Sequence, residues 1–99
     1  MRISPAQIPE IRRIVRESLG DEATVRLFGS RLDDSARGGD VDLLIEVPGD
    51  IERPALIGAQ LAARVSRALH GRHVDVVLAA ANLRPLPIHT IARQTGQLL

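Results

Sequence analysis

The sequence has 99 residues, a length that fits one domain, and 44% hydrophobic and 25% charged residues are ordinary values for a globular protein. It has no cysteine, which excludes disulfides and thiolate metal sites, and no lysine, which excludes Schiff-base chemistry and a P-loop. A formal charge of +1 and a single aromatic residue argue against direct nucleic-acid binding. No apolar run is long enough to span a membrane and no secretory signal is visible, so we expect a cytoplasmic protein without membrane contact.

The first element expected along the chain is a helix that becomes regular near Pro9 and ends at Gly20. Ser4 and Gln7 have the spacing of a capping box, whereas Pro9 argues against an unbroken helix from Ser4 onward. Apolar side chains then recur at helical spacing, at Ile8, Ile11, Val15 and Leu19. The opposite face carries Arg12, Arg13 and Arg16, which we interpret as a solvated face. DNA binding through these arginines is a weaker alternative that a steep salt dependence would support.

Short strands and helices alternate in the rest of the chain. Strands are expected over residues 24–28, 41–47 and 73–78, where β-branched and apolar residues cluster between turn residues. Helices are expected over residues 53–69 and 88–94. This order indicates an α/β sandwich, with helices packed on a small sheet of about three strands. The longer helix is sufficient for a crossover, so the third strand is expected to return parallel to the second.

A glycine and a serine at the end of the first strand form a candidate phosphate site. Gly29 and Ser30 offer unhindered backbone N–H groups and a hydroxyl, which suit phosphate oxygens. Arg31 could contact a nucleotide phosphate or pair with Asp33 or Asp34, and the sequence leaves both open. We therefore assign Gly29, Ser30 and Arg31 as candidate nucleotide-binding residues.

Three aspartates are candidate metal ligands. Asp40 and Asp42 stand two apart at the start of the second strand, so both side chains leave the same face and can reach one cation. Oxygen ligands of this kind select Mg²⁺ or Mn²⁺. Asp75 interrupts an apolar strand, where an unpaired aspartate is unfavourable, and completes a three-carboxylate site if its strand neighbours the second one. Three carboxylates can hold two ions about 3.5–4 Å apart for an in-line phosphoryl displacement.

These residues resemble a known family. Gly29-Ser30-Arg31, then Asp40-Val41-Asp42-Leu43-Leu44-Ile45 and Asp75 downstream, are similar to the minimal nucleotidyltransferase (MNT) group of the polymerase-β-like nucleotidyltransferase superfamily. The resemblance covers about residues 24–78. It implies an αβ core with a mixed sheet, divalent metal bound by Asp40, Asp42 and Asp75, and nucleotide phosphates held by Gly29 and Ser30. It also implies that residues 1–99 form a single minimal nucleotidyltransferase domain.

The resemblance implies a function and a partner. Proteins of this size in the family are typically antitoxins of a HEPN-domain ribonuclease toxin, and active members transfer AMP from ATP to a tyrosine of that toxin. The expected chemistry is therefore Mg²⁺-dependent transfer to a hydroxyl of a partner, with Asp40, Asp42 and Asp75 as catalytic residues and two Mg²⁺ ions. The alternative is a non-catalytic module that neutralises its partner by complex formation. An oligomer is left open.

We interpret the three histidines and the apolar residues near the C-terminus from their positions in or next to the expected helices. His70 and His73 flank Gly71 at a helix end, where a positive charge is favourable, so we interpret both as structural. His89 is expected at the surface or toward a partner. Apolar residues assigned to the last helix indicate either a protein contact or a short helix that simply covers the sheet: Ile88, Ile91, Leu98 and Leu99.

Overall fold

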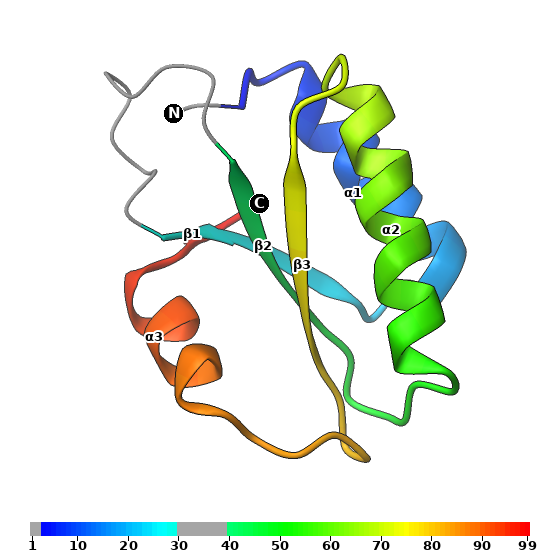
Figure 1. Cartoon of the computed structure of the whole chain (residues 1–99), viewed down its shortest axis with the longest axis vertical. Coiled ribbons are helices and arrows are strands. Elements are labelled where there is room, and N and C mark those ends of the chain that lie inside the picture. Colours follow the sequence, from blue (N-terminus) through cyan, green and yellow to red (C-terminus); the bar gives the residue numbers. More distant parts are fainter. Residues whose placement is uncertain (1–2, 30–39) are drawn as a thin grey trace.

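A four-stranded sheet with the order β3-β2-β1-β4 forms the centre of the computed structural model, which describes residues 3–29 and 40–99 (Figure 1). The described elements, in chain order, are α1 (Gln7–Leu19), β1 (Thr24–Phe28), β2 (Val41–Glu46), α2 (Pro54–Ala68), β3 (Val74–Ala79), α3 (Pro87–Thr95) and β4 (Gln97–Leu98). Each expected helix and strand is present, with its ends shifted by no more than two residues.

The sheet is mixed, and the predicted parallel return of the third strand is confirmed. β1 pairs antiparallel with β2, whereas β3 pairs parallel with β2 after the crossover through α2. The sheet has one strand more than the approximately three that we expected, because residues 97–98 form a fourth strand that pairs antiparallel with Arg26 and Leu27 of β1. A two-residue strand carries too little alternation to be recognised in a sequence. Its partner β1 therefore lies inside the sheet, and β3 lies at the opposite edge.

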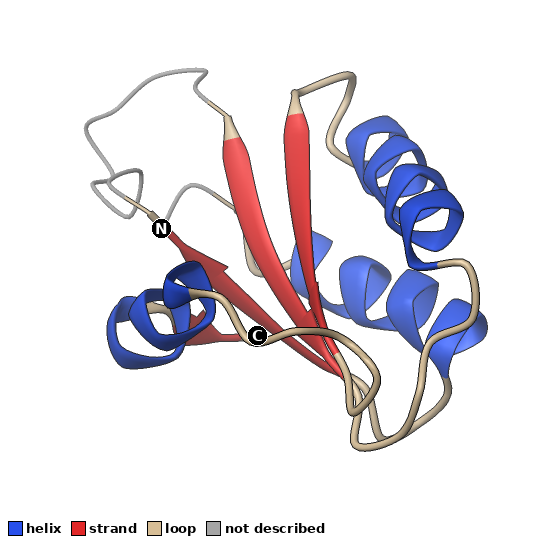
Figure 2. Ribbon diagram, turned by 60° about the horizontal axis from the view of Figure 1, so that its bottom comes forward, coloured by secondary structure: helices blue, strands red, loops and turns tan. Residues whose placement is uncertain are grey.

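Helices cover both faces of the sheet, which separates the interior into two clusters (Figure 2). On one face, α1 and α2 bury a large cluster that includes Ile11, Leu43 and Leu61. On the other face, α3 covers a smaller cluster of Phe28, Leu44, Ala79 and Ala92. Successive strand residues point to opposite faces, so Leu43 and Leu44 enter different clusters. The buried run in β2 is therefore typical of an interior strand covered on both sides.

The start of α1 differs from the expected cap. The helix begins at Gln7, two residues before Pro9, and its N-cap is Ala6 without a side-chain hydrogen bond. Pro9 is accommodated because it lies in the first turn, where the backbone N–H has no intrahelical partner to lose. The Gln7 side chain still accepts a hydrogen bond from the backbone N–H of Ser4 at 3.0 Å. One of the two hydrogen bonds of the predicted capping box is therefore present, although the N-cap is Ala6 and not Ser4.

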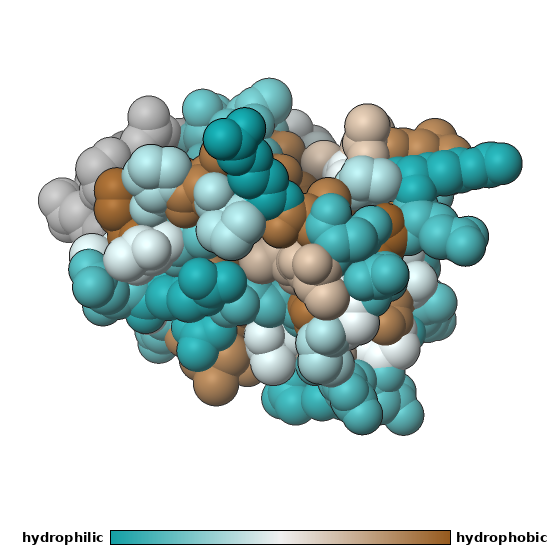
Figure 3. Space-filling view, turned by 90° about the horizontal axis from the view of Figure 1, so that it is seen from below, coloured by the Kyte–Doolittle hydropathy of each residue, from teal (hydrophilic) through white to brown (hydrophobic). Residues whose placement is uncertain are grey.

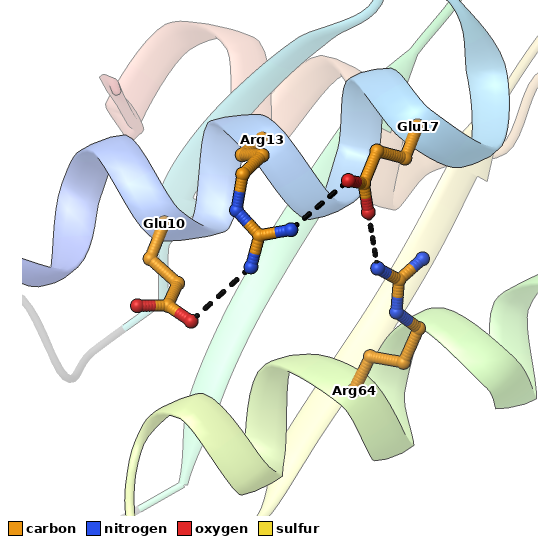
Figure 4. Close-up of polar contacts among 4 residues, drawn as sticks. All are labelled: Glu10, Arg13, Glu17 and Arg64. Atoms are coloured by element: carbon orange, nitrogen blue, oxygen red, sulfur yellow. Dashed lines mark hydrogen bonds and ion pairs between the residues drawn. The ribbon is translucent and has the colours of Figure 1, made fainter.

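A charged network joins the outer faces of α1 and α2 (Figure 4). Glu17 accepts hydrogen bonds from Arg13 of its own helix and from Arg64 of α2, and Arg13 also contacts Glu10. The bond from Arg64, then the bond from Arg13, lowers the pKa of the Glu17 carboxyl. Because the folded-state pKa lies below the unfolded value, this contribution to stability is present above the unfolded pKa. It is lost as the pH falls through the folded pKa. The group is exposed, so the contribution is small and decreases with added salt.

The last helix corrects two predictions. His89 is only 4% exposed, whereas we expected it at the surface or toward a partner. It faces the sheet, where its Nδ1 accepts from the Leu86 backbone N–H at 3.0 Å and its Nε2 lies 3.1 Å from the Leu78 carbonyl oxygen. The residues assigned to one apolar helix surface divide among different elements, because Leu98 lies in β4 and Leu99 packs against the larger core.

The surface of the described residues carries scattered apolar side chains. The most exposed include Leu86, Ile91 and Leu98. The face seen in Figure 3 shows hydrophobic residues in several small groups separated by hydrophilic ones. Within the described ranges, no helix has both the length and the apolar character needed to cross a bilayer.

Candidate active site

The first residues of β2 and β3 lie side by side at one end of the sheet (Figure 1). Asp42 is in register with Asp75, and each is the second residue of its strand. Asp40 and His73 occupy the matching positions just before the two strands, where the Val41 N–H donates to the His73 carbonyl at 2.9 Å. The parallel pairing therefore brings four polar side chains together from segments about thirty residues apart in the sequence.

The two strand aspartates share the face of the sheet that α3 covers. Asp42 lies two residues before Leu44, and Asp75 lies four residues before Ala79. Leu44 and Ala79 both pack in the smaller cluster under α3. Because side chains alternate along a strand, Asp42 and Asp75 point to this same side, beyond the end of that cluster. Both carboxylates therefore leave the sheet in one direction.

Asp40, His73 and Asp75 form a compact group of potential ligands. One ligand atom from each lies within 4.8 Å of the others. The His73 Nε2 is 3.0 Å from Asp75 Oδ1, and these two side chains are 64% and 55% exposed. Sequence reasoning missed His73, because its position after a helix end favoured a structural interpretation. Its spacing two residues before Asp75 was the available signal, since that spacing places both side chains on one face.

The Asp42 carboxylate is directed toward the end of β1. Phe28, the last residue of β1, is in register with Asp42, and Gly29 follows it. Gly29 has a φ of +97°, and a Cβ built there would lie 2.7 Å from Asp42 Oδ2. Only a residue without a side chain allows the carboxylate to lie so close to this backbone. The structure thus places Gly29 directly beside Asp42, whereas Ser30 and Arg31, with Asp33 and Asp34, lie outside the described residues.

The donor set fits a divalent cation. Carboxylate oxygens are the ligands that Mg²⁺ and Mn²⁺ use in proteins, and like charges brought this close are stabilised by a cation between them. Asp40 and Asp75 lie within reach of one ion, and Asp42 stands beside Asp75 in the sheet. A backbone turn through glycine next to such a cation suits phosphate oxygens. Fold and site together form an α/β domain whose exposed carboxylates and glycine turn have the chemistry that a metal-dependent reaction on a phosphate compound requires.

The chain belongs to the nucleotidyltransferase domain family, whose sequence profile matches residues 8–95. Members of this family take a nucleotide as substrate and use a divalent metal. This assignment confirms the resemblance on which the sequence-based expectations rested. None of the curated proteins matches this sequence.

Several solved structures share the fold. A chain of the toxin–antitoxin MntA–HepT has a TM-score of 0.65 at 17% identity, over 96% of this chain and 70% of that one. A chain of a toxin–antitoxin with AMP-PNP has a TM-score of 0.66 at 18% identity, over 91% of this chain and 69% of that one. A third match is a chain from the structure of the tri-AMPylated Shewanella oneidensis HEPN toxin in complex with MNT antitoxin. Its TM-score is 0.63 at 17% identity, over 94% of this chain and 68% of that one. These similarities confirm the nucleotidyltransferase fold.

Proposed function

We propose that this chain transfers AMP from ATP to a hydroxyl, most simply a tyrosine, of a partner HEPN ribonuclease toxin, and so acts in the cytoplasm as the antitoxin of the pair. Membership of the nucleotidyltransferase domain family supports the reaction class. The observation that carries the proposal is the meeting of Asp40 and Asp75 at the starts of two adjacent parallel strands, with Gly29 against Asp42. Asp40, Asp42 and Asp75 would hold the metal, and Gly29 and Ser30 the nucleotide phosphates.

The reaction exchanges one phosphorus–oxygen bond for another. The acceptor oxygen bonds to the α-phosphorus of ATP, the bond from that phosphorus to the bridging oxygen breaks, and pyrophosphate leaves. The hydroxyl proton passes to a carboxylate, for which the solvent-accessible Asp75 is the candidate. Two divalent ions held by Asp40, Asp42 and Asp75 would neutralise phosphate charge and so support an in-line displacement at the α-phosphorus.

The acceptor is proposed to belong to another protein. This chain contains no tyrosine, so it cannot be its own tyrosine acceptor. Asp75 and His73 are more than half exposed, which leaves the candidate site open to an approaching protein. One of the structural neighbours is a tri-AMPylated HEPN toxin in complex with an MNT antitoxin, which supports a partner of the same kind here.

The proposal is tested by incubating the chain with Mg²⁺, ATP and the product of the neighbouring gene, which the proposal expects to be a HEPN-domain protein, and by following the intact mass of that product. We expect a gain of one or more AMP units. Label from α-³²P-ATP should appear on the acceptor, whereas label from γ-³²P-ATP should not, because the γ-phosphate leaves in pyrophosphate. ATP with a methylene group between its α- and β-phosphates should not support transfer.

Transfer of the γ-label would contradict nucleotidyl transfer and indicate a kinase. If the two proteins form a stable complex but the partner gains no mass with any nucleotide that is supplied, the result would instead support the non-catalytic binding module. Both results are informative because complex formation, measured by size-exclusion chromatography, does not depend on transfer.

Replacing Gly29 by alanine is expected to lower AMP transfer by about a hundredfold. The new Cβ would lie 2.7 Å from Asp42 Oδ2, so the carboxylate must move, and misplacements of about 1 Å at a site can cost this much. The rate of acceptor labelling at saturating ATP is the measurement.

Gly20→Ala is the matched control for Gly29→Ala. Gly20 has a similar φ of +93° but nothing within 4 Å of the built Cβ. Both variants should lose about 1–3 kcal/mol of stability from backbone strain. Only Gly29→Ala should lose transfer, and equal losses in the two variants would show that strain alone is responsible.

A further inference from the structure

We propose that His73 is a ligand of the divalent ion together with Asp40 and Asp75, and that its imidazole shifts the metal preference of the site from Mg²⁺ toward Mn²⁺. The inference rests on the metal site of the proposed function and adds a residue that the aspartate pattern does not contain. Mg²⁺ is selective for oxygen, whereas Mn²⁺ belongs to the first-row metals that also accept imidazole nitrogen. One nitrogen ligand among the carboxylates therefore favours Mn²⁺.

The side-chain geometry supports His73 as a ligand. Its Nε2 is 3.0 Å from Asp75 Oδ1, and a ligand atom of Asp40 completes a group within 4.8 Å. These two atoms lie at hydrogen-bond distance from each other. The lone pairs of the imidazole nitrogen and the carboxylate oxygen can instead be directed at a metal ion. The side chains of His73 and Asp75 are both more than half exposed, so a metal ion can reach them from solvent.

The backbone holds His73 in this place. Its carbonyl accepts the Val41 N–H at 2.9 Å, and the register of β2 with β3 continues from this bond. The parallel register that places Asp75 beside Asp42 therefore also places His73 beside Asp40. The other two histidines have different surroundings. His70 is exposed at the end of α2 with a φ of +61°, and His89 is buried next to Leu78 near the far end of β3.

The test uses the full chain, purified without a histidine tag and loaded with Mn²⁺ in a buffer free of imidazole. Pulsed electron paramagnetic resonance detects the ¹⁴N nucleus of a coordinated imidazole. We expect ¹⁴N modulation in the unmodified protein, its loss in His73→Gln, and its retention in His70→Asn, a substitution that suits the positive φ of that residue. Absence of modulation in the unmodified protein, or its persistence in His73→Gln, would overturn the proposal.

Calorimetric titration with MnCl₂ and MgCl₂ provides the second readout. The ratio of Mn²⁺ to Mg²⁺ affinity should fall by about tenfold or more in His73→Gln and remain unchanged in His70→Asn. An equal loss for both metals would show that His73 acts without coordinating, and this result would also overturn the proposal. Neither measurement involves AMP transfer. A protein that binds Mn²⁺ through nitrogen but modifies no toxin would refute the proposed function alone.

Discussion

Asp75→Asn is expected to lower the rate of AMP transfer by about 10³-fold or more, the order found when a phosphoryl-transfer site loses one charge-stabilising group. Asparagine keeps the shape of the side chain and removes the negative charge that would hold the metal and accept the hydroxyl proton. Because this side chain is 55% exposed, the fold should persist. The measurement is the initial rate of labelling from α-³²P-ATP, with circular dichroism as the check on folding.

Asp50→Asn is the matched control for this experiment. Asp50 is also exposed, but it lies after β2, at the other end of that strand from Asp40. The control should transfer AMP at the unmodified rate, whereas Asp40→Asn and Asp42→Asn should lose activity like Asp75→Asn. A folded Asp75→Asn protein that still labels its partner within about tenfold of the normal rate would remove Asp75 from the proposed chemistry.

The strands that carry the site could be predicted because their signals are local. Residues 43–45 are apolar on both sides of the strand, and the structure buries Leu43 under α1 and α2 and Leu44 under α3. Asp75 interrupts such an apolar run, and a charge in this setting is costly unless it reaches solvent or a cation. Asp42 was located differently, by its spacing of two residues from Asp40 at the start of a strand.

Features that depend on pairing between distant segments could not be predicted in the same way. His73 and Asp75 are close neighbours along the chain, but they meet Asp40 only because β2 and β3 are parallel and in register at their first residues. The closeness of Gly29 to Asp42 likewise requires the antiparallel register of β1 with β2. A single sequence states the residue types but contains no measure of register. The histidine was therefore assigned to its nearest local feature, the end of a helix.

The C-terminal strand illustrates the same limit. Gly96 was expected to end a helix, and it does follow α3. Its second role is visible only in three dimensions, because the chain turns there and brings residues 97–98 against β1. The only sequence feature associated with this tertiary contact is Gly96 itself, because a two-residue strand has no periodic pattern.

Gly96→Ala is therefore expected to destabilise the fold by about 1–3 kcal/mol, the usual cost of forcing an extra carbon into a packed site. A Cβ at this position would lie 2.3 Å from the Ala92 carbonyl oxygen and 3.2 Å from the Leu27 carbonyl oxygen. Both are backbone atoms, so neither can rotate away, and the end of α3 or the β1–β4 pairing must shift. Thermal unfolding should show a fall of about 4–8 °C for each kcal/mol in a domain of this size.

Gly49→Ala separates this contact from the general effect of replacing a glycine. Gly49 lies in the turn after β2, with no neighbouring atom within 4 Å of the built Cβ and no left-handed φ. Alanine there reduces the freedom of the unfolded chain and should change the stability by less than about 1 kcal/mol. The midpoint of unfolding should therefore fall clearly in Gly96→Ala and hardly change in Gly49→Ala. Equal midpoints would mean that the turn before β4 relaxes freely, and that β4 contributes little to holding β1 beside the candidate active site.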